Sequence, residues 1–140
     1  MDVISAWKRE STTGTFRIPI KIMNPVTNVS ILKYCLYDTG FSGYLGLDDE
    51  TIRVLGLKQI GIGKALAAKG LLEYATFLGR ADLIDEKNAT IGEIHSNSED
   101  KIERDDIPIQ EFDINIVGLK AIVQFNWLIL GDKDVLCLLK

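Results

Sequence analysis

The residues best suited to chemistry are Asp38, Thr39 and Gly40, which follow the apolar run 30–37 directly. A carboxylate at the end of a rigid strand is held in one position, as acid–base catalysis requires. The hydroxyl of Thr39 can tie the loop down. Gly40 has no side chain, so the backbone can approach the carboxylate and donate an N–H to it. The tripeptide indicates a catalytic carboxylate, although an ordinary strand-to-turn junction also produces it.

The segments around this tripeptide must position it. Residues 15–23 alternate between apolar and polar side chains, and residues 30–37 are apolar on both faces toward their end. Both patterns predict strands, and the second strand enters the core just before Asp38. Residues 48–57 predict a short helix, with Asp48 as its N-cap and Gly56 at its end.

A long hairpin is predicted over residues 64–84, with its turn at Ala68-Lys69-Gly70. Gly70 can adopt the positive φ that such a turn requires. The alanine-rich stretch 64–69 is also compatible with a helix.

The rest of the chain is predicted to be mostly strands, at residues 88–94, 111–117 and 121–130. The polar stretch 95–106 predicts an exposed loop. We therefore expect residues 1–140 to form a single mainly β domain with one or two short helices.

Several of these segments resemble the prokaryotic retropepsin-like aspartic proteases. The resemblance rests first on Asp-Thr-Gly-Phe-Ser-Gly-Tyr-Leu at residues 38–45. It rests also on Leu-Gly-Leu at residues 55–57, which follows the acidic start of a predicted helix. Ala-Ala-Lys-Gly at 67–70 is similar to the flap turn of that family. Leu-Ile-Leu-Gly at 128–131 is similar to its apolar-apolar-glycine signature. The resemblance spans about residues 15–136.

This resemblance implies a closed acid-protease barrel with the catalytic loop at its mouth. Asp38 would be the catalytic carboxylate, in a loop formed with Thr39, Gly40 and Ser42. Thr39 would grip the loop of the partner subunit, and Gly131 would lie in a loop beneath the carboxylate. The flap that closes over a peptide would contain Ala67, Ala68, Lys69, Gly70 and Leu71.

Aspartic proteolysis needs two carboxylates that share one proton, and only one Asp-Thr-Gly is present in 140 residues. The second Asp38 is therefore expected from an identical subunit, giving a homodimeric endopeptidase that acts on peptides or proteins without a cofactor. The chain after Gly131 is shorter than the family pattern. We expect the closing strand to be short or absent and residues 1–11 to serve the dimer interface instead. The alternative is a non-catalytic dimerisation or peptide-binding module of the same fold.

Composition limits the other possibilities. The net charge is −4 and the basic residues are scattered, which argues against a nucleic-acid partner. No apolar run reaches the roughly 18 residues of a membrane helix, and residues 1–10 lack the apolar stretch of a signal peptide. We therefore expect a cytoplasmic protein without a membrane partner, in which Cys35 and Cys137 are buried free thiols.

Other catalytic classes have little support. His95 is the only histidine and lies beside the polar loop, which argues against a histidine-based triad and a histidine-rich metal site, and no metal is expected. Asp-x-Gly also occurs in sugar-kinase and actin-like folds. Those folds need two large lobes with helices between strands, for which this chain is too short.

Overall fold

The computed structural model describes residues 2–97 and 102–140, and it is mainly β, as predicted. The helical elements are α1 (Asp49–Leu55), α2 (Leu119–Ile122) and the 3₁₀ turn η2 (Gly131–Lys133). The strands are β1 (Val3–Lys8), β2 (Arg17–Met23), β3 (Ser30–Tyr37), β4 (Leu45–Leu47), β5 (Gln59–Ala67), β6 (Gly70–Ile84), β7 (Thr90–Ile94), β8 (Ile107–Glu111), β9 (Ile116–Val117), β10 (Asn126–Leu130) and β11 (Val135–Leu139).

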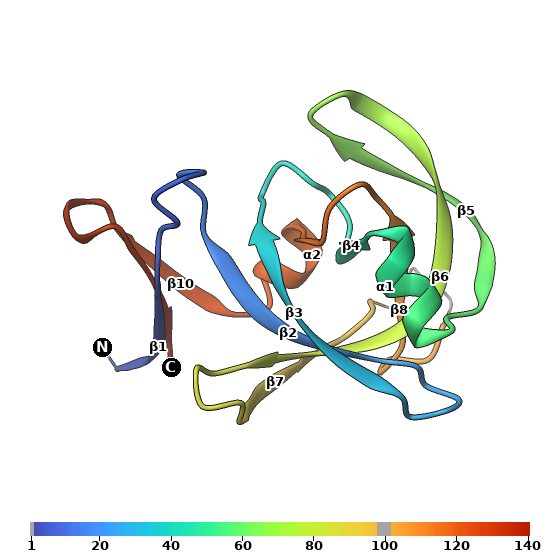
Figure 1. Ribbon diagram of the computed structural model, residues 1–140, viewed down its shortest axis with the longest axis horizontal. Coiled ribbons are helices and arrows are strands. Elements are labelled where there is room, and N and C mark those ends of the chain that lie inside the picture. Colours follow the sequence, from blue (N-terminus) through green and yellow to red (C-terminus); the bar gives the residue numbers. More distant parts are fainter. Residues whose placement is uncertain (1, 98–101) are drawn as a thin grey trace.

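The larger sheet curls into a ring (Figure 1). Its strand order is β2-β3-β9-β4-β8-β6, and β2 also pairs with β6, which closes the circuit. The long strand β6 uses different stretches for different partners, and it also carries β5 and β7. A closed ring removes most free strand edges and encloses one apolar core.

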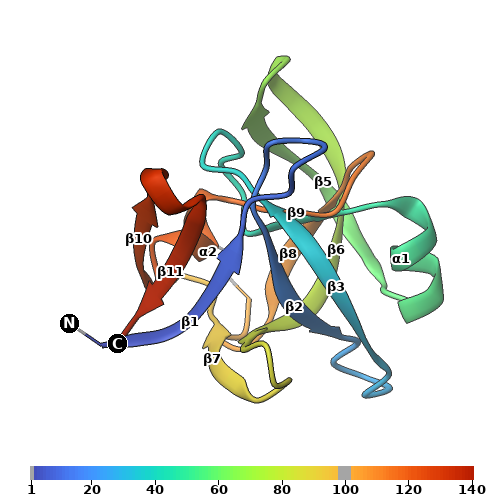
Figure 2. The same cartoon turned by 60° about the vertical axis from the view of Figure 1, so that its left-hand side comes forward.

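A second, three-stranded sheet gathers both ends of the chain, in the order β1-β11-β10 (Figure 2). We call it the terminal sheet. The closing strand, expected to be short or absent, is present as the five-residue β11 (Val135–Leu139), which pairs on both sides. Strand β1, from the segment 1–11 proposed for the dimer interface, pairs with β11 of its own chain. The apolar side chains of Leu136 and Leu138 explain this, since both are buried in the main core.

The alternation in the sequence accounts for the core. Ile18, Ile20 and Ile22 point inward from β2 and are at most 1% exposed. Helix α1 has the predicted ends: the Asp48 carboxylate accepts a hydrogen bond from the Thr51 N–H (2.8 Å), and Gly56 follows it at φ 65°. The Asp48 N-cap and the glycine with positive φ at the C-terminus of α1 are therefore both as predicted.

The predicted hairpin is present and longer than expected. Its first strand, β5, begins at Gln59, and the turn lies between Ala67 and Gly70, which pair with each other. Gly70 takes φ +107°, a conformation that favours glycine. The helical alternative for residues 64–69 is wrong.

Two strand predictions in the last third are wrong. The stretch predicted as one strand over 111–117 is split, because β8 ends at Glu111 and β9 begins at Ile116. The stretch 121–130 starts as the end of helix α2 and becomes strand only at Asn126. Short apolar runs fit a buried helix and a buried strand equally well, so periodicity could not separate them.

The predicted loop 95–106 is only partly exposed, and its residues 98–101 lie outside the described ranges. Ser96 and Asp106 are 8% and 7% exposed. Ser96 is buried because its hydroxyl donates to the Glu103 carbonyl (3.0 Å), and Asp106 because it binds Arg80 (2.6 Å). No helix in the described ranges is long and apolar enough to cross a membrane.

Candidate active site: a carboxylate facing a hairpin

Asp38 lies at the first position after β3, where the chain leaves the ring. Its N–H donates to the Val117 carbonyl of β9 (3.1 Å), and its carboxylate accepts the Gly40 N–H (2.8 Å). This is the backbone contact that the spacing of Asp-Thr-Gly predicted. Thr39 and Gly40 are exposed beside it. The backbone of Asp38 is thus anchored to β9, and its carboxylate is held by the Gly40 N–H.

The short strand β9 fixes the loop from below. It runs between β3, with which it is parallel, and β4, with which it is antiparallel. Directly after it, the Gly118 N–H donates to the Tyr44 carbonyl (2.9 Å) and the Leu119 N–H to the Phe41 carbonyl (2.8 Å). We call the packed unit of residues 38–43 and 116–119 the loop crossing.

Gly118 is required by this close approach. A Cβ at position 118 would lie 2.3 Å from the Gly43 carbonyl oxygen and 2.6 Å from the Phe41 ring. The expectation that Gly131 occupies this place is wrong. Gly131 starts the 3₁₀ turn between β10 and β11, and a Cβ there would meet nothing within 4 Å. The apolar-apolar-glycine beneath Asp38 is Ile116-Val117-Gly118.

Ser42 connects the loop crossing to the hairpin. Its N–H donates to the Leu66 carbonyl and its hydroxyl accepts the Leu66 N–H, both at 2.9 Å. This pair of bonds ties the end of β5 to the Asp38 loop. In Figures 1 and 2 the hairpin tip and the loop after β3 project on the same side of the ring.

An open cleft of about 560 Å³ lies between the loop and the hairpin. It contains Asp38 together with three of the five predicted flap residues, Ala67, Ala68 and Lys69. Gly70 and Leu71 lie just beyond, in the turn and at the start of β6. The rest of the lining was not predicted: Asp49, Leu72, Tyr74, Glu111, Phe112, Asp113 and Ile114.

An aromatic row supports the cleft wall. Phe41 is fully buried in the loop crossing, and its ring lies 5.7 Å from that of Phe112. Phe112 in turn stacks on Tyr74 of the hairpin, with ring centroids 5.5 Å apart. Such contacts add roughly 0.5–1.5 kcal/mol each beyond area burial. The row connects the Asp38 loop, the hairpin and the segment after β8. The sequence did not predict the role of that last segment, because its pattern indicates one strand over residues 111–117.

Three groups near the loop crossing have displaced pKa values. Burial raises the pKa of the Cys35 thiol, on β3, to about 12. Burial also raises the pKa of Tyr37. Burial alone would raise the pKa of Asp48, but hydrogen bonds from Thr51 and the nearby charge of Lys33 lower it overall. Cys35 and Cys137 are both buried and free, as predicted.

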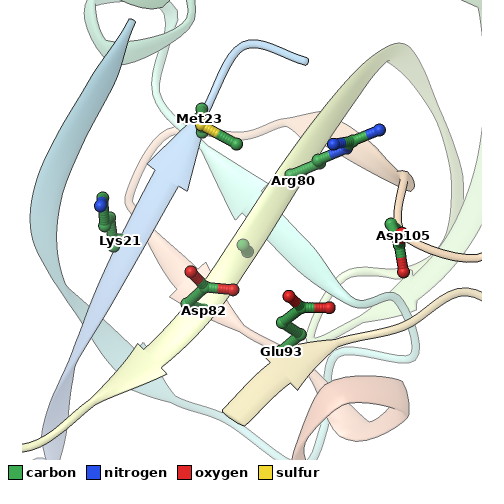
Figure 3. Close-up of a pocket in the computed structure, with 7 residues that line it drawn as sticks. Lys21, Met23, Arg80, Asp82, Glu93 and Asp105 are labelled. Atoms are coloured by element: carbon green, nitrogen blue, oxygen red, sulfur yellow. The ribbon is translucent and has the colours of Figure 1, made fainter. Parts of the chain in front are cut away.

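A second, smaller hollow is lined by residues of β2, β6 and β7 together with Asp105 (Figure 3). Asp82 on β6 and Glu93 on β7 stand side by side there, and burial, followed by the charge of Glu93, raises the pKa of Asp82. Its remaining lining is Lys21, Met23, Arg80, Ala81 and Asp105. Acidic and basic side chains therefore line the hollow together.

His95 stands beside this hollow, and together with Glu93 and Asp105 it offers ligand atoms within 4.8 Å of one another. We did not expect a metal-ligating group around the single histidine. Glu93 approaches Nε2 (3.9 Å), whereas Asp105 approaches Nδ1 (3.5 Å). A metal ion takes one imidazole nitrogen, so carboxylates that approach opposite nitrogens are not arranged as a chelate with His95.

Comparison with models of known protein families and with curated proteins finds no match for this sequence. The functional argument therefore depends on the geometry of the cleft.

Proposed function

We propose that this protein is a retropepsin-like aspartic endopeptidase that acts as a homodimer. The observation that carries the proposal is the position of Asp38. Its carboxylate is fixed by the Gly40 N–H at the wall of an open cleft, opposite a hairpin that can cover a bound chain. The loop crossing supplies the rigid support that a catalytic carboxylate requires.

The placement of β9 supports the acid-protease barrel. The family resemblance assigns an apolar-apolar-glycine to the loop beneath the carboxylate, and Ile116-Val117-Gly118 occupies that place. The closed ring of strands agrees with the same barrel. Residues 116–118 are therefore a better match to the apolar-apolar-glycine segment of the family than the later Leu-Ile-Leu-Gly.

The reaction requires two Asp38 carboxylates, one from each subunit, that share a proton. The ionised carboxylate takes a proton from water, whose oxygen bonds to the peptide carbonyl carbon. The protonated carboxyl donates its proton to the carbonyl oxygen. The tetrahedral intermediate then gives a hydroxyl proton to the Asp38 carboxylate that is now ionised. The other Asp38 carboxyl donates its proton to the leaving nitrogen as the C–N bond breaks, so the pair again shares one proton. Each Asp38 thus needs its partner within hydrogen-bond reach of the same water.

Exposed apolar surface supports the dimer. The outer strands of the terminal sheet, β1 and β10, carry Val3 (56% exposed) and Ile129 (53%). On the hairpin, Leu71 is 64% exposed. Thr39 is also exposed, as a residue that grips a partner loop must be. Burying such side chains between copies is favourable at about 25 cal/mol per Å² of apolar surface.

The direct test compares the wild type with Asp38→Asn, which keeps the size of the side chain and removes its acid–base function. We expect wild-type protein to cleave a peptide library at acid or neutral pH, and Asp38→Asn to lose at least about a thousandfold in rate. Glu50→Gln, an exposed change of the same charge on α1, is the matched control. Cleavage that persists in Asp38→Asn excludes the aspartic mechanism.

Mixed dimers test whether two carboxylates share one site. Wild type and Asp38→Asn are mixed in equal amounts and allowed to exchange subunits. Because only wild-type pairs are active, activity falls to about one quarter of that of an equal total amount of wild type. A fall to one half indicates that each subunit works alone.

The second candidate is a non-catalytic peptide-binding or dimerisation module of the same fold. The exposed apolar side chains of the terminal sheet and hairpin favour it as much as they favour the protease. A dimer proven by analytical ultracentrifugation that cleaves no peptide at any pH would establish this reading.

A further inference from the structure

The cleft is strongly acidic. Its lining includes four carboxylates, on Asp38, Asp49, Glu111 and Asp113, and one ammonium, on Lys69, which is a formal charge of −3. The whole chain has a net charge of only −4. Like charges in a concave site reinforce one another and attract ligands of the opposite sign.

Three of these carboxylates, on Asp38, Glu111 and Asp113, have no ion-pair partner among the described residues. Asp49 pairs with Arg53 four residues further along α1 (2.9 Å). Glu111 is the last residue of β8 and Asp113 lies two positions later, on either side of Phe112, whose ring contacts the loop crossing. They are therefore positioned to receive a cation from a chain that lies along the cleft.

We propose that the cleft selects cationic polypeptide segments, with a Lys or Arg side chain of the bound chain between Glu111 and Asp113. This inference rests on the proposed function for the location of the substrate. The apolar walls, among them Leu72, Tyr74 and Phe112, suit the aliphatic stem of Lys or Arg. The two carboxylates take its charged end. Lys69, at the turn of the hairpin, opposes the same charge, so its removal strengthens binding.

The experiment measures binding separately from cleavage. The full-length Asp38→Asn protein is titrated with fluorescein-labelled ten-residue peptides that differ only in two central residues, both Lys, both Gln or both Glu. We expect the Lys peptide to bind at least about tenfold more tightly than the Gln peptide, and the Glu peptide to bind most weakly. The advantage of the Lys peptide shrinks between 50 mM and 500 mM salt, because exposed charges are screened.

Variants that remove charged groups test which residues cause the preference for the Lys peptide. Adding Glu111→Gln and Asp113→Asn to Asp38→Asn removes most of the advantage of the Lys peptide, whereas Lys69→Gln increases it. Glu50→Gln, an exposed carboxylate of α1 outside the cleft, is the matched control and leaves it unchanged. Circular dichroism checks that each variant is folded.

The outcomes separate the two proposals. Equal affinities for the three peptides, or a Lys preference that survives the Glu111 and Asp113 changes, overturns the inference even if the wild type cleaves peptides. Selective binding of the Lys peptide with no cleavage by the wild type supports the inference and overturns the proposed catalysis.

Discussion

The loop crossing and the terminal sheet contain the same short pattern with opposite outcomes. Ile116-Val117-Gly118 passes beneath Asp38, where the glycine touches backbone. Ile129-Leu130-Gly131 ends an outer strand and leads into an open turn. Ile116 is 1% exposed, whereas Ile129 is 53% exposed. An apolar-apolar-glycine pattern therefore identifies a loop support only when a second chain segment lies within backbone contact of the glycine.

We expect the largest difference in stability between the two regions when Gly118 and Gly131 are each replaced by alanine. Gly118→Ala forces Cβ against the Gly43 carbonyl and the Phe41 ring, so we expect it to lower the free energy of unfolding by about 3 kcal/mol or more. Gly131→Ala meets open space and restricts the unfolded chain, so we expect between no change and a gain of about 1 kcal/mol. Urea titration of both variants measures this. Equal losses at the two positions would contradict the structural difference.

The same contrast explains what the sequence could predict. Strand β2, helix α1 and the hairpin turn follow from local rules, because alternation, the Asp48 cap and the positive φ of Gly70 each act within a few residues. The Gly40 contact with Asp38 is equally local. The role of Gly118 is not, because it depends on Phe41 and Gly43, about 75 residues earlier in the chain.

The cleft wall escaped prediction for a related reason. Glu111 and Asp113 acquire their place because the chain leaves strand β8 and turns toward the loop crossing before β9. Alternating apolar residues over 111–117 predicted a continuous strand instead. No local signal distinguishes an alternation that lines a cleft from one that lies in a sheet. The acidic character of the site could therefore not be inferred from the sequence alone.

The next prediction compares Asp48, which lies near the loop crossing, with Asp134, which lies near the terminal sheet. Asp48 caps α1, and its own N–H is held by the Asn115 side chain just before β9 (2.9 Å). Asp134, just before β11, makes an exposed ion pair with Arg9, just after β1 (2.8 Å). We expect Asp48→Ala to cost about 1 kcal/mol at neutral pH and Asp134→Asn, which tolerates the same positive φ, less than about 0.5 kcal/mol. Thermal unfolding of both variants tests the order.

The loss at Asp48 also depends on pH. Its pKa in the folded protein is below the ordinary value of 3.8, so its ionised form contributes stability above that value and loses it as pH falls through the folded pKa. The stability advantage of the wild type over Asp48→Asn, a neutral cap, should therefore shrink as pH falls through the folded pKa. A difference that stays the same at every pH would show that the carboxylate charge is not involved.

A smaller effect is expected at the link between the loop crossing and the hairpin. Ser42→Ala removes the hydroxyl that accepts the Leu66 N–H, at a cost of about 0.5–1 kcal/mol because water can replace an exposed bond. Hydrogen exchange at Leu66 should accelerate while the amides of the terminal sheet remain unchanged. Ser11→Ala, an exposed serine before β2, is the control. Unchanged exchange at Leu66 would mean that the backbone bond alone holds the hairpin.

The two cysteines report on how the two sheets open, because Cys35 lies in ring strand β3, just before the loop crossing, and Cys137 is central in the terminal sheet. The ring is closed, whereas the terminal sheet has two outer strands, so we expect the terminal sheet to open first. In a series of urea concentrations below the global midpoint, alkylation followed by mass spectrometry should modify Cys137 at least about ten times faster than Cys35. Burial and a pKa of about 12 keep the Cys35 thiol unreactive until the ring itself opens. Equal rates at both thiols would show instead that the two sheets unfold as a single cooperative unit.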